Sequence, residues 1–191
     1  VEMNVTYWSI ENGRFFAFIR DINRRQRSEA LLKIRMQLAE IAQDGSLDDI
    51  LQMALDAAER FTGSQISFFH LVDPHQEHRS LQTWSTNTRK ICTAKYLHYL
   101  LDQVGAWADY VGQGQPIIYN DYASLPGKKG LPSDHTPLVR ELMTPIQRNQ
   151  QIVAILGLGN KPEDYNDDDL EVIQQLADIT MRVIERKSAE E

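Results

Sequence analysis

The spacing of apolar residues predicts two strands and a helix at the start of the chain. Residues 3–10 and 15–19 are rich in aromatic and β-branched residues, and the Asn12-Gly13 pair between them is a frequent hairpin turn. Residues 28–43 instead carry apolar residues every three or four positions, as one face of a helix does. The residues of this apolar stripe are Leu31, Ile34, Leu38 and Ile41.

The rest of the chain predicts a sheet with helices at both ends. A second helix is expected to begin after Ser46, a favourable N-cap, and to end at Thr62-Gly63. Further strands are expected at 65–72, 80–85, 116–120, 142–148 and 151–159, further helix at 94–112 and 167–187, and a long loop at 121–137. This order predicts an α+β fold in which an antiparallel sheet carries the terminal helices on one face. The strand at 65–72 is apolar on both sides and is therefore expected to be central.

Composition narrows the class of protein further. The chain has 191 residues, a formal net charge of −7 and 42% hydrophobic residues, which is typical of a globular protein. No apolar run approaches the roughly 18 residues of a membrane span, and the first residues lack the pattern of a secretory signal. The one cysteine, Cys92, cannot form an internal disulfide. We therefore expect a cytoplasmic protein without membrane insertion.

The charges are distributed unevenly along the chain. Residues 14–35 contain seven basic side chains and two acidic ones, whereas residues 161–191 are strongly acidic. A basic segment can bind nucleic acid, but this one lacks interleaved aromatic residues and lies at a predicted helix start. A solvated helix face explains it better, so we expect no nucleic-acid partner.

Three ordered motifs in the second half of the chain resemble a GAF domain. They begin at Pro116-Ile-Ile-Tyr-Asn, at His135-Thr-Pro-Leu, and at Gly157-Leu-Gly-Asn-Lys, the last followed by Tyr165 and Asp168. The resemblance is to the GAF type found in bacterial sensor histidine kinases and related signalling proteins. It implies an antiparallel GAF-type sheet with a ligand pocket between the sheet and the segment 94–137.

The segment before this region resembles the end of a PAS domain. The predicted hairpin is followed by Arg20-Asp-Ile-Asn-Arg and a basic helix start, which is similar to the exit of a PAS domain into a connecting helix. The resemblances imply a PAS hairpin at 1–27, a linker helix at 28–43, a GAF domain at 44–187 and the start of a connector at 188–191. We expect a homodimer through the flanking helices, with the apolar stripe as its seam, and partner domains upstream (PAS) and downstream (output).

The GAF resemblance also implies which residues line the pocket. The expected ligand-binding residues are Trp107, Tyr110, Tyr119, Asn120, His135 and Pro137. Trp84 could either line the pocket or belong to the core. The ligand and any cofactor remain unknown. Asn160 and Lys161 partly match the set conserved in cyclic-nucleotide-binding GAF domains, but an ion pair and a helix cap explain this turn better.

Metal binding and catalysis find little support in the sequence. His75 and His78 lie three residues apart in a predicted turn without a second pair of ligands, and Cys92 lacks the following histidine of bilin-binding GAF domains. GAF-fold methionine sulfoxide reductases use several cysteines, and this chain has one. We therefore expect no metal and no enzymatic activity, with any kinase or cyclase activity in an output domain. The expected function is a small-molecule sensor; the alternative is a ligand-free module for dimerisation and signal relay.

Overall fold

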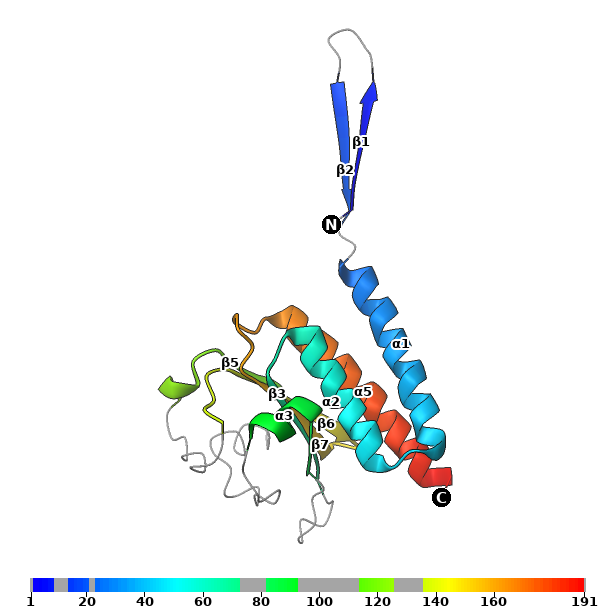
Figure 1. Ribbon diagram of the computed structural model, residues 1–191, viewed down its shortest axis with the longest axis vertical. Coiled ribbons are helices and arrows are strands. Elements are labelled where there is room, and N and C mark those ends of the chain that lie inside the picture. The colour runs from blue at the N-terminus through cyan, green and yellow to red at the C-terminus, as the bar shows by residue number, and fades with distance from the viewer. Residues whose placement is uncertain are drawn as a thin grey trace.

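A computed structural model describes residues 2–8, 14–20, 23–72, 82–92, 114–125 and 136–190. The helices and strands follow one another along the chain as shown in Figure 1. They are β1 (Glu2–Trp8), β2 (Arg14–Arg20), α1 (Asn23–Asp44), α2 (Leu47–Thr62), β3 (Ile66–Leu71), β4 (Gln82–Trp84), α3 (Thr86–Ile91), β5 (Ile117–Tyr119), the 3-10 helix η2 (Tyr122–Ser124), β6 (Glu141–Arg148), β7 (Gln151–Gly159) and α5 (Asp167–Glu190).

The strands form two separate antiparallel sheets. β1 and β2 pair only with each other, as the Asn12-Gly13 signal predicted. The main sheet has five strands in the order β4-β3-β7-β6-β5, and every neighbouring pair is antiparallel. This confirms the predicted α+β fold and the position of β3 inside the sheet. The turn between β6 and β7 consists of Asn149 and Gln150, both with positive φ (51° and 65°), as a tight hairpin turn requires.

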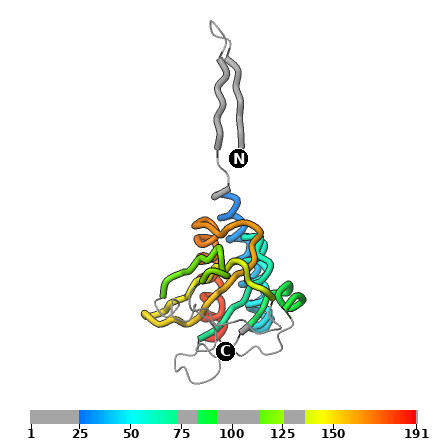
Figure 2. Tube along the Cα trace, turned by 90° about the vertical axis from the view of Figure 1, so that its left-hand side faces the viewer, coloured from blue at the N-terminus to red at the C-terminus, as the bar shows by residue number. Residues whose placement is uncertain are grey.

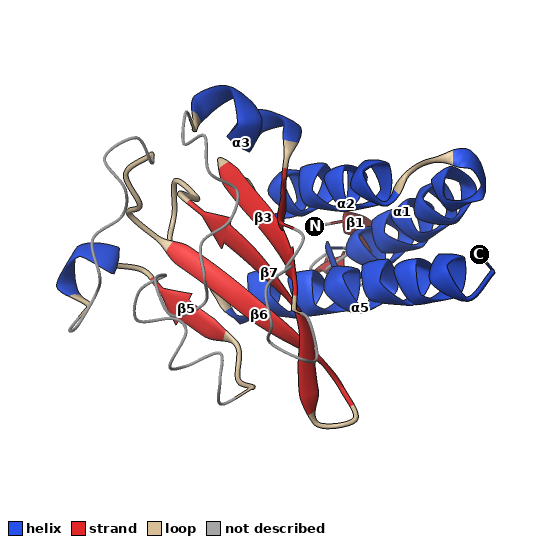
Figure 3. Cartoon of the chain, turned by 90° about the horizontal axis from the view of Figure 1, so that it is seen from below, coloured by secondary structure: helices blue, strands red, loops and turns tan. Residues whose placement is uncertain are grey.

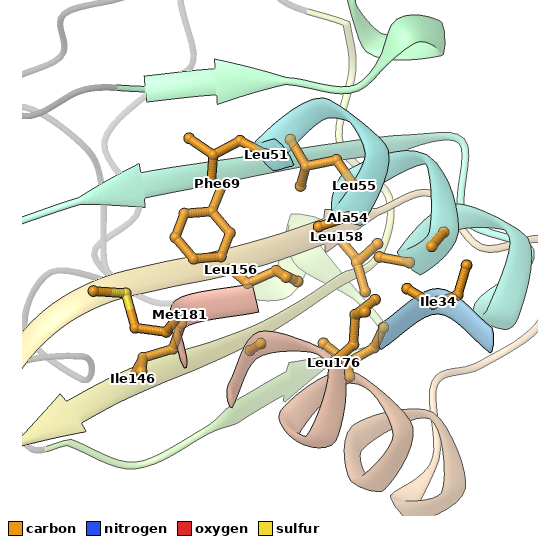
Figure 4. Packing of buried hydrophobic residues seen from close by; sticks show 14 of the residues in the cluster. Ile34, Leu51, Ala54, Leu55, Phe69, Ile146, Leu156, Leu158, Leu176 and Met181 are labelled. Atoms are coloured by element: carbon orange, nitrogen blue, oxygen red, sulfur yellow. The ribbon is translucent and has the colours of Figure 1, made fainter. Parts of the chain in front are cut away.

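Helices α2 and α5 cover one face of the main sheet, as predicted (Figure 3). Between them and the strands lies the main hydrophobic core, shown in close-up in Figure 4. Phe69, Leu142, Leu156 and Leu158 supply the sheet side of this core, and Leu51, Leu55 and Leu176 supply much of the helix side. Figure 2 shows the opposite side of the sheet, with the strands in front of the helices.

Helix α1 packs against α2 and α5 of its own chain. Its residues Leu31, Ile34 and Leu38 are buried in the main core, and Leu38 is fully inaccessible. The interpretation of this apolar stripe as the seam of a dimer is therefore wrong, because its side chains are already buried in the core of their own chain. The large apolar side chains that α1 does expose are Leu32 and Met36, at 59% and 68%.

Helices α1 and α5 run side by side in the same direction (Figure 1). Near their N-termini, Arg27 pairs with Asp168 at 3.1 Å. Near their C-termini, the Lys187 ammonium donates a hydrogen bond to the Ala42 carbonyl at 3.1 Å. Helices α1 and α5 are thus linked near both of their ends.

The ends of the helices show why the sequence signals worked for α2 and failed for α3. Ser46 and Asp49 form a reciprocal capping box at the start of α2, and Gly63 ends the helix with φ of 75°. The short helix α3 was not predicted, because its residues have no apolar period. It is held by Ser85, whose side chain accepts a hydrogen bond from the Thr88 amide. None of the helices in the described residues is long and apolar enough to cross a membrane.

Candidate functional site

The face of the main sheet opposite α2 and α5 is the outer face, and the strand register determines which residues lie on it. Side chains alternate between the two faces of a strand. Since Leu142 points into the main core, its neighbours Glu141 and Met143 point to the outer face. Two rows of paired residues cross this face, namely Trp84, Phe68, Gly157, Met143 and Ile117 in one, and Ile66, Gly159, Glu141 and Tyr119 in the other.

The first row is apolar and well buried. Met143 is fully inaccessible and packs with Ile117 and Ile155, while Phe68 and Tyr119 border this cluster. At the edge of the sheet, Trp84 packs with Cys92 and Phe68. Trp84 thus belongs to a buried aromatic cluster on the outer face. It is a core residue, as one interpretation of the sequence had it, and it also lies on the face where the other interpretation placed the pocket.

Two glycines of β7 make room on this face for side chains from neighbouring segments. A Cβ on Gly157 would overlap the ring of Phe68, so this ring covers the strand where a side chain would otherwise stand. A Cβ on Gly159 would lie only 2.7 Å from Cδ1 of both Ile66 and Leu138. Part of the outer face is therefore filled by the domain's own side chains.

Glu141 is the one acidic residue in these two rows, and the sequence analysis missed it. Glu141 is 6% exposed, and within the described part of the chain its Oε2 atom has no hydrogen-bond partner. Burial raises the pKa of Glu141 to about 8. The nearby Tyr122 also has a raised pKa, chiefly from its own burial and further from the charge of Glu141. The sequence did offer one signal that could have identified Glu141, namely a glutamate within a strand whose two faces are both apolar.

The structure places three of the six predicted pocket residues. Tyr119 lies on β5, directly opposite Glu141. The side chain of Asn120 is tied to the backbone of Tyr165: its Nδ2 donates to the carbonyl at 3.0 Å, and its Oδ1 accepts from the amide at 2.8 Å. Pro137 is exposed, and its carbonyl accepts a hydrogen bond from the Asn160 side chain at 2.8 Å. Trp107, Tyr110 and His135 lie outside the described residues.

The turn before α5 has the structural role that its sequence predicted. Lys161 and Asp169 form a buried ion pair with an N–O distance of 2.6 Å. Asn166 and Asp169 exchange hydrogen bonds at 3.0 and 3.1 Å, which caps the helix. Tyr165 is buried beneath this turn, and its hydroxyl is 2.7 Å from Ser64 Oγ. The acid that pairs with Lys161 is Asp169, whereas Asp168 pairs with Arg27.

A second polar cluster lies between α2 and α3. Glu59 accepts hydrogen bonds from Ser67 at 2.9 Å, from Thr88 at 3.3 Å and from Ser85. Burial raises the pKa of Glu59, and these three hydrogen bonds oppose that shift. The carboxylate borders an open cleft of about 340 Å³. Because its hydrogen bonds come from the fold itself, we assign Glu59 a structural role in joining α2, β3 and α3.

Within the described ranges, no group of three or more His, Cys, Asp or Glu side chains could hold a metal ion. The His75 and His78 pair lies outside those ranges. Cys92 is buried at the C-cap of α3, against Trp84 and Phe68.

Comparison with known proteins identifies relatives of the domain. The family model of the GAF domain matches residues 44–185. A curated protein, the methyl sulfide methyltransferase-associated sensor of Methanosarcina acetivorans, is 32% identical over 186 residues. That alignment covers 92% of this chain but only 18% of the sensor.

Solved structures share the fold at low sequence identity. The free methionine-R-sulfoxide reductase of Neisseria meningitidis, solved with its substrate, superposes with a TM-score of 0.68 and 14% identity, covering 91% of this chain and 97% of that one. The GAF domain of an Acinetobacter phosphoenolpyruvate-protein phosphotransferase gives a TM-score of 0.57 and 16% identity, covering 83% and 94%.

These fold neighbours correct the expectation that the chain is not an enzyme. That prediction is wrong, because enzymes of the methionine-R-sulfoxide reductase class have the same fold over most of this chain. The physical reason is that a fold positions side chains without fixing the chemistry they perform. The presence of one cysteine and the lack of familiar motifs were insufficient grounds to exclude catalysis.

Proposed function

Because this chain belongs to the GAF domain family, we propose that it is a sensory module that binds a small molecule at the outer face of its main sheet. The observation that carries this proposal is the outer face itself: buried apolar and aromatic side chains surround one acidic residue, Glu141. A mostly apolar wall with few polar groups is typical of small-molecule sites. The sensor from Methanosarcina acetivorans supports a signalling role, although the chain spans only 18% of its length.

The binding residues in this proposal are those inferred from the family resemblance. They are Trp107, Tyr110, Tyr119, Asn120, His135 and Pro137. The position of Tyr119 on the outer face, opposite Glu141, supports its inclusion. Asn120 and Pro137 contact the turn before α5, so a ligand that reaches them would also act on that turn.

A route for the signal follows from the alternation of residues in β6 and β7. Met143 faces the outer side of the sheet, while its neighbour Leu142 packs in the core with residues of α5. At the end of β6, Arg148 pairs with Asp178 and Glu185 of α5 at 3.0 and 2.9 Å. A ligand that favours one arrangement of β6 would therefore shift α5 and the adjacent α1, provided that it binds the two states with different affinity.

The proposed setting is a cytoplasmic signalling protein of the sensor histidine kinase type. In this proposal residues 1–27 are the last hairpin of a PAS domain, 28–43 a linker helix, 44–187 the GAF domain and 188–191 the start of a connector to the output domain. The direct contact between the parallel helices α1 and α5 supports a role in coupling an upstream domain to a downstream one.

The proposal can be tested by native mass spectrometry and absorbance spectroscopy of the purified chain. We expect a bound mass or a chromophore on the wild type, and its loss in the variant Trp107→Ala. A matched control is Trp8→Ala, which removes a tryptophan from the proposed PAS hairpin and is expected to keep the bound mass. A binding site elsewhere is indicated if Trp107→Ala and the wild type carry the same ligand.

The second candidate function is a ligand-free module for dimerisation and relay. It is favoured by one observation, the filling of the space above Gly157 and Gly159 by Phe68, Ile66 and Leu138. A bare, colourless dimer that binds none of the small molecules tested would support this function over the first.

Both functions involve a homodimer, and the exposed side of α1 is our proposed interface. Leu32 and Met36 lie one helical turn apart, on the side of α1 away from the core. We expect the double variant Leu32→Glu/Met36→Glu to be monomeric, with its thermal midpoint within about 2 °C of the wild type, since surface changes have small effects on stability. Light scattering coupled to size exclusion measures the mass.

The control for this experiment is Arg35→Glu, an exposed change on the same helix that alters the net charge by the same amount. It is expected to leave the dimer intact. A double variant that remains dimeric, or a wild type that is already monomeric, would exclude this interface.

A further inference from the structure

The carboxyl group of Glu141 is unusual among the buried polar groups of the domain. Lys161 and Asp169 neutralise each other, and Glu59 accepts three hydrogen bonds from hydroxyl groups. Glu141 has no such arrangement, because its Oε2 atom is buried without a hydrogen-bond partner in the described structure. Glu141 takes part in none of the ion pairs of 4.0 Å or less among the described residues.

The neighbours of Glu141 on the outer face cannot supply a counter-charge. Directly across the strands lie Gly159 and Tyr119, and the next residue of β6 on the same face is Met143. A buried polar group without a partner is destabilising by about 1–3 kcal/mol, and an unpaired buried charge by more. A position that served only the fold would therefore be better occupied by an apolar residue or by glutamine with partners.

We propose that Glu141 is the recognition residue of the outer-face site and that its ligand is a small organic cation, an amine with an apolar body. The inference rests on the sensory function proposed above and specifies the chemical class of the ligand. The ammonium group donates a hydrogen bond to Oε2 and supplies the missing positive charge. The apolar body lies against Tyr119 and Phe68, the half-buried aromatic residues of the same face.

The aromatic residues of the outer face fit the same class of ligand. Tyr119 is paired with Glu141 across β5 and β6, and the ring of Phe68 covers Gly157 in the adjacent row. Organic cations are attracted to the faces of aromatic rings as well as to carboxylates. An anionic ligand would instead meet a like charge whenever Glu141 is ionised.

Recognition of a cation by this carboxyl group couples binding to pH. The pKa of Glu141 is raised to about 8, so at neutral pH the empty site holds mostly the protonated acid. The amine binds the ionised form, and the proton of Glu141 is released to solvent. The apparent affinity for the amine scales with the fraction of Glu141 that is ionised. This affinity is therefore expected to rise about 50-fold between pH 6 and pH 8. The charge of Glu141 acts on two titratable groups, Tyr122 and Tyr165, and Asp169, which also acts on Tyr165, is already paired with Lys161.

The test compares amines with neutral molecules of the same shape. Isoamylamine and phenethylamine are titrated against the purified chain alongside isoamyl alcohol and phenethyl alcohol, with binding followed by NMR at pH 6, 7 and 8. We expect the wild type to prefer each amine over its alcohol by at least tenfold at pH 8. We also expect the carbon resonance of the Glu141 carboxyl group to move towards its ionised position when amine is added at pH 7.

Two variants separate recognition from folding. Glu141→Gln keeps the shape and removes the ionisable group, and it is expected to fold and to bind amine and alcohol equally. Glu141→Asp retains the acid on a shorter side chain and is expected to keep a preference for amines with reduced affinity.

The possible failures are distinguishable. If amines and alcohols bind the wild type equally at every pH, the chain has a binding site but Glu141 is not its recognition residue. If neither class binds the wild type at millimolar concentration, this inference is overturned, and the sensory function is then judged separately by the bound mass and its loss in Trp107→Ala.

Discussion

Replacement of Leu38 by aspartate is expected to unfold the domain. Leu38 is fully inaccessible in the core formed by α1, α2, α5 and the sheet. Removal of a buried leucine side chain alone costs about 2–5 kcal/mol, and the new carboxylate would be buried without a partner, which adds several kcal/mol. The sum approaches the entire stability of a typical domain, roughly 5–15 kcal/mol. Circular dichroism and urea denaturation at pH 7.5 measure the effect.

The control is the same substitution six residues earlier on the same helix. Leu32 is 59% exposed, so Leu32→Asp changes the same residue type without burying a charge. We expect its free energy of unfolding to remain within about 0.5 kcal/mol of the wild type, as for other surface positions. Equal stability of the Leu38 and Leu32 variants would show that α1 does not pack against the domain.

This pair of residues also shows what a hydrophobic period can and cannot predict. The spacing of Leu31, Ile34 and Leu38 correctly identified the buried side of α1. It could not identify the partner, because a stripe that packs on α2 and α5 has the same spacing as a stripe in a dimer seam. Only the closeness of α5, which lies more than 120 residues later in the chain, decides between them.

Local signals sufficed wherever the structure is fixed by neighbouring residues. Ser46 predicted the start of α2, and the two strands predicted at 142–148 and 151–159, only two residues apart, form the β6–β7 hairpin. Helix α3 escaped prediction because its stability comes from distant groups. Ser85 and Thr88 donate hydrogen bonds to Glu59 of α2, and the Thr86 amide donates one to Asp56 at 2.8 Å.

The candidate site was predicted only in part for a similar reason. The family resemblance drew attention to Tyr119, which lies on the outer face. It gave no role to Glu141, which lies outside the three motifs and just before the strand predicted at 142–148. The register with Gly159 and Tyr119, which no single segment contains, is what places this carboxyl group between two strands.

The stability of the wild type is expected to fall as pH rises from about 5 to about 8, relative to the variant Glu141→Gln. Burial raises the pKa of Glu141 from 4.5 to about 8. Between these values the unfolded chain has released its proton while the folded chain retains it, so the folded state binds more protons and each increase in pH favours unfolding. The slope from this one group is about 1.4 kcal/mol per pH unit, and the total is roughly 5 kcal/mol at most.

Comparison with Glu141→Gln isolates this contribution, because all other titrating groups are shared. We expect similar free energies of unfolding for both proteins near pH 5, and a glutamine variant more stable by several kcal/mol at pH 8.5. Urea denaturation at half-unit pH steps gives the difference curve. Parallel curves would mean that Glu141 ionises near its ordinary pKa, through solvent access or a cationic neighbour. A cationic ligand added at pH 8.5 should stabilise the wild type alone, since only the carboxylate can pair with it.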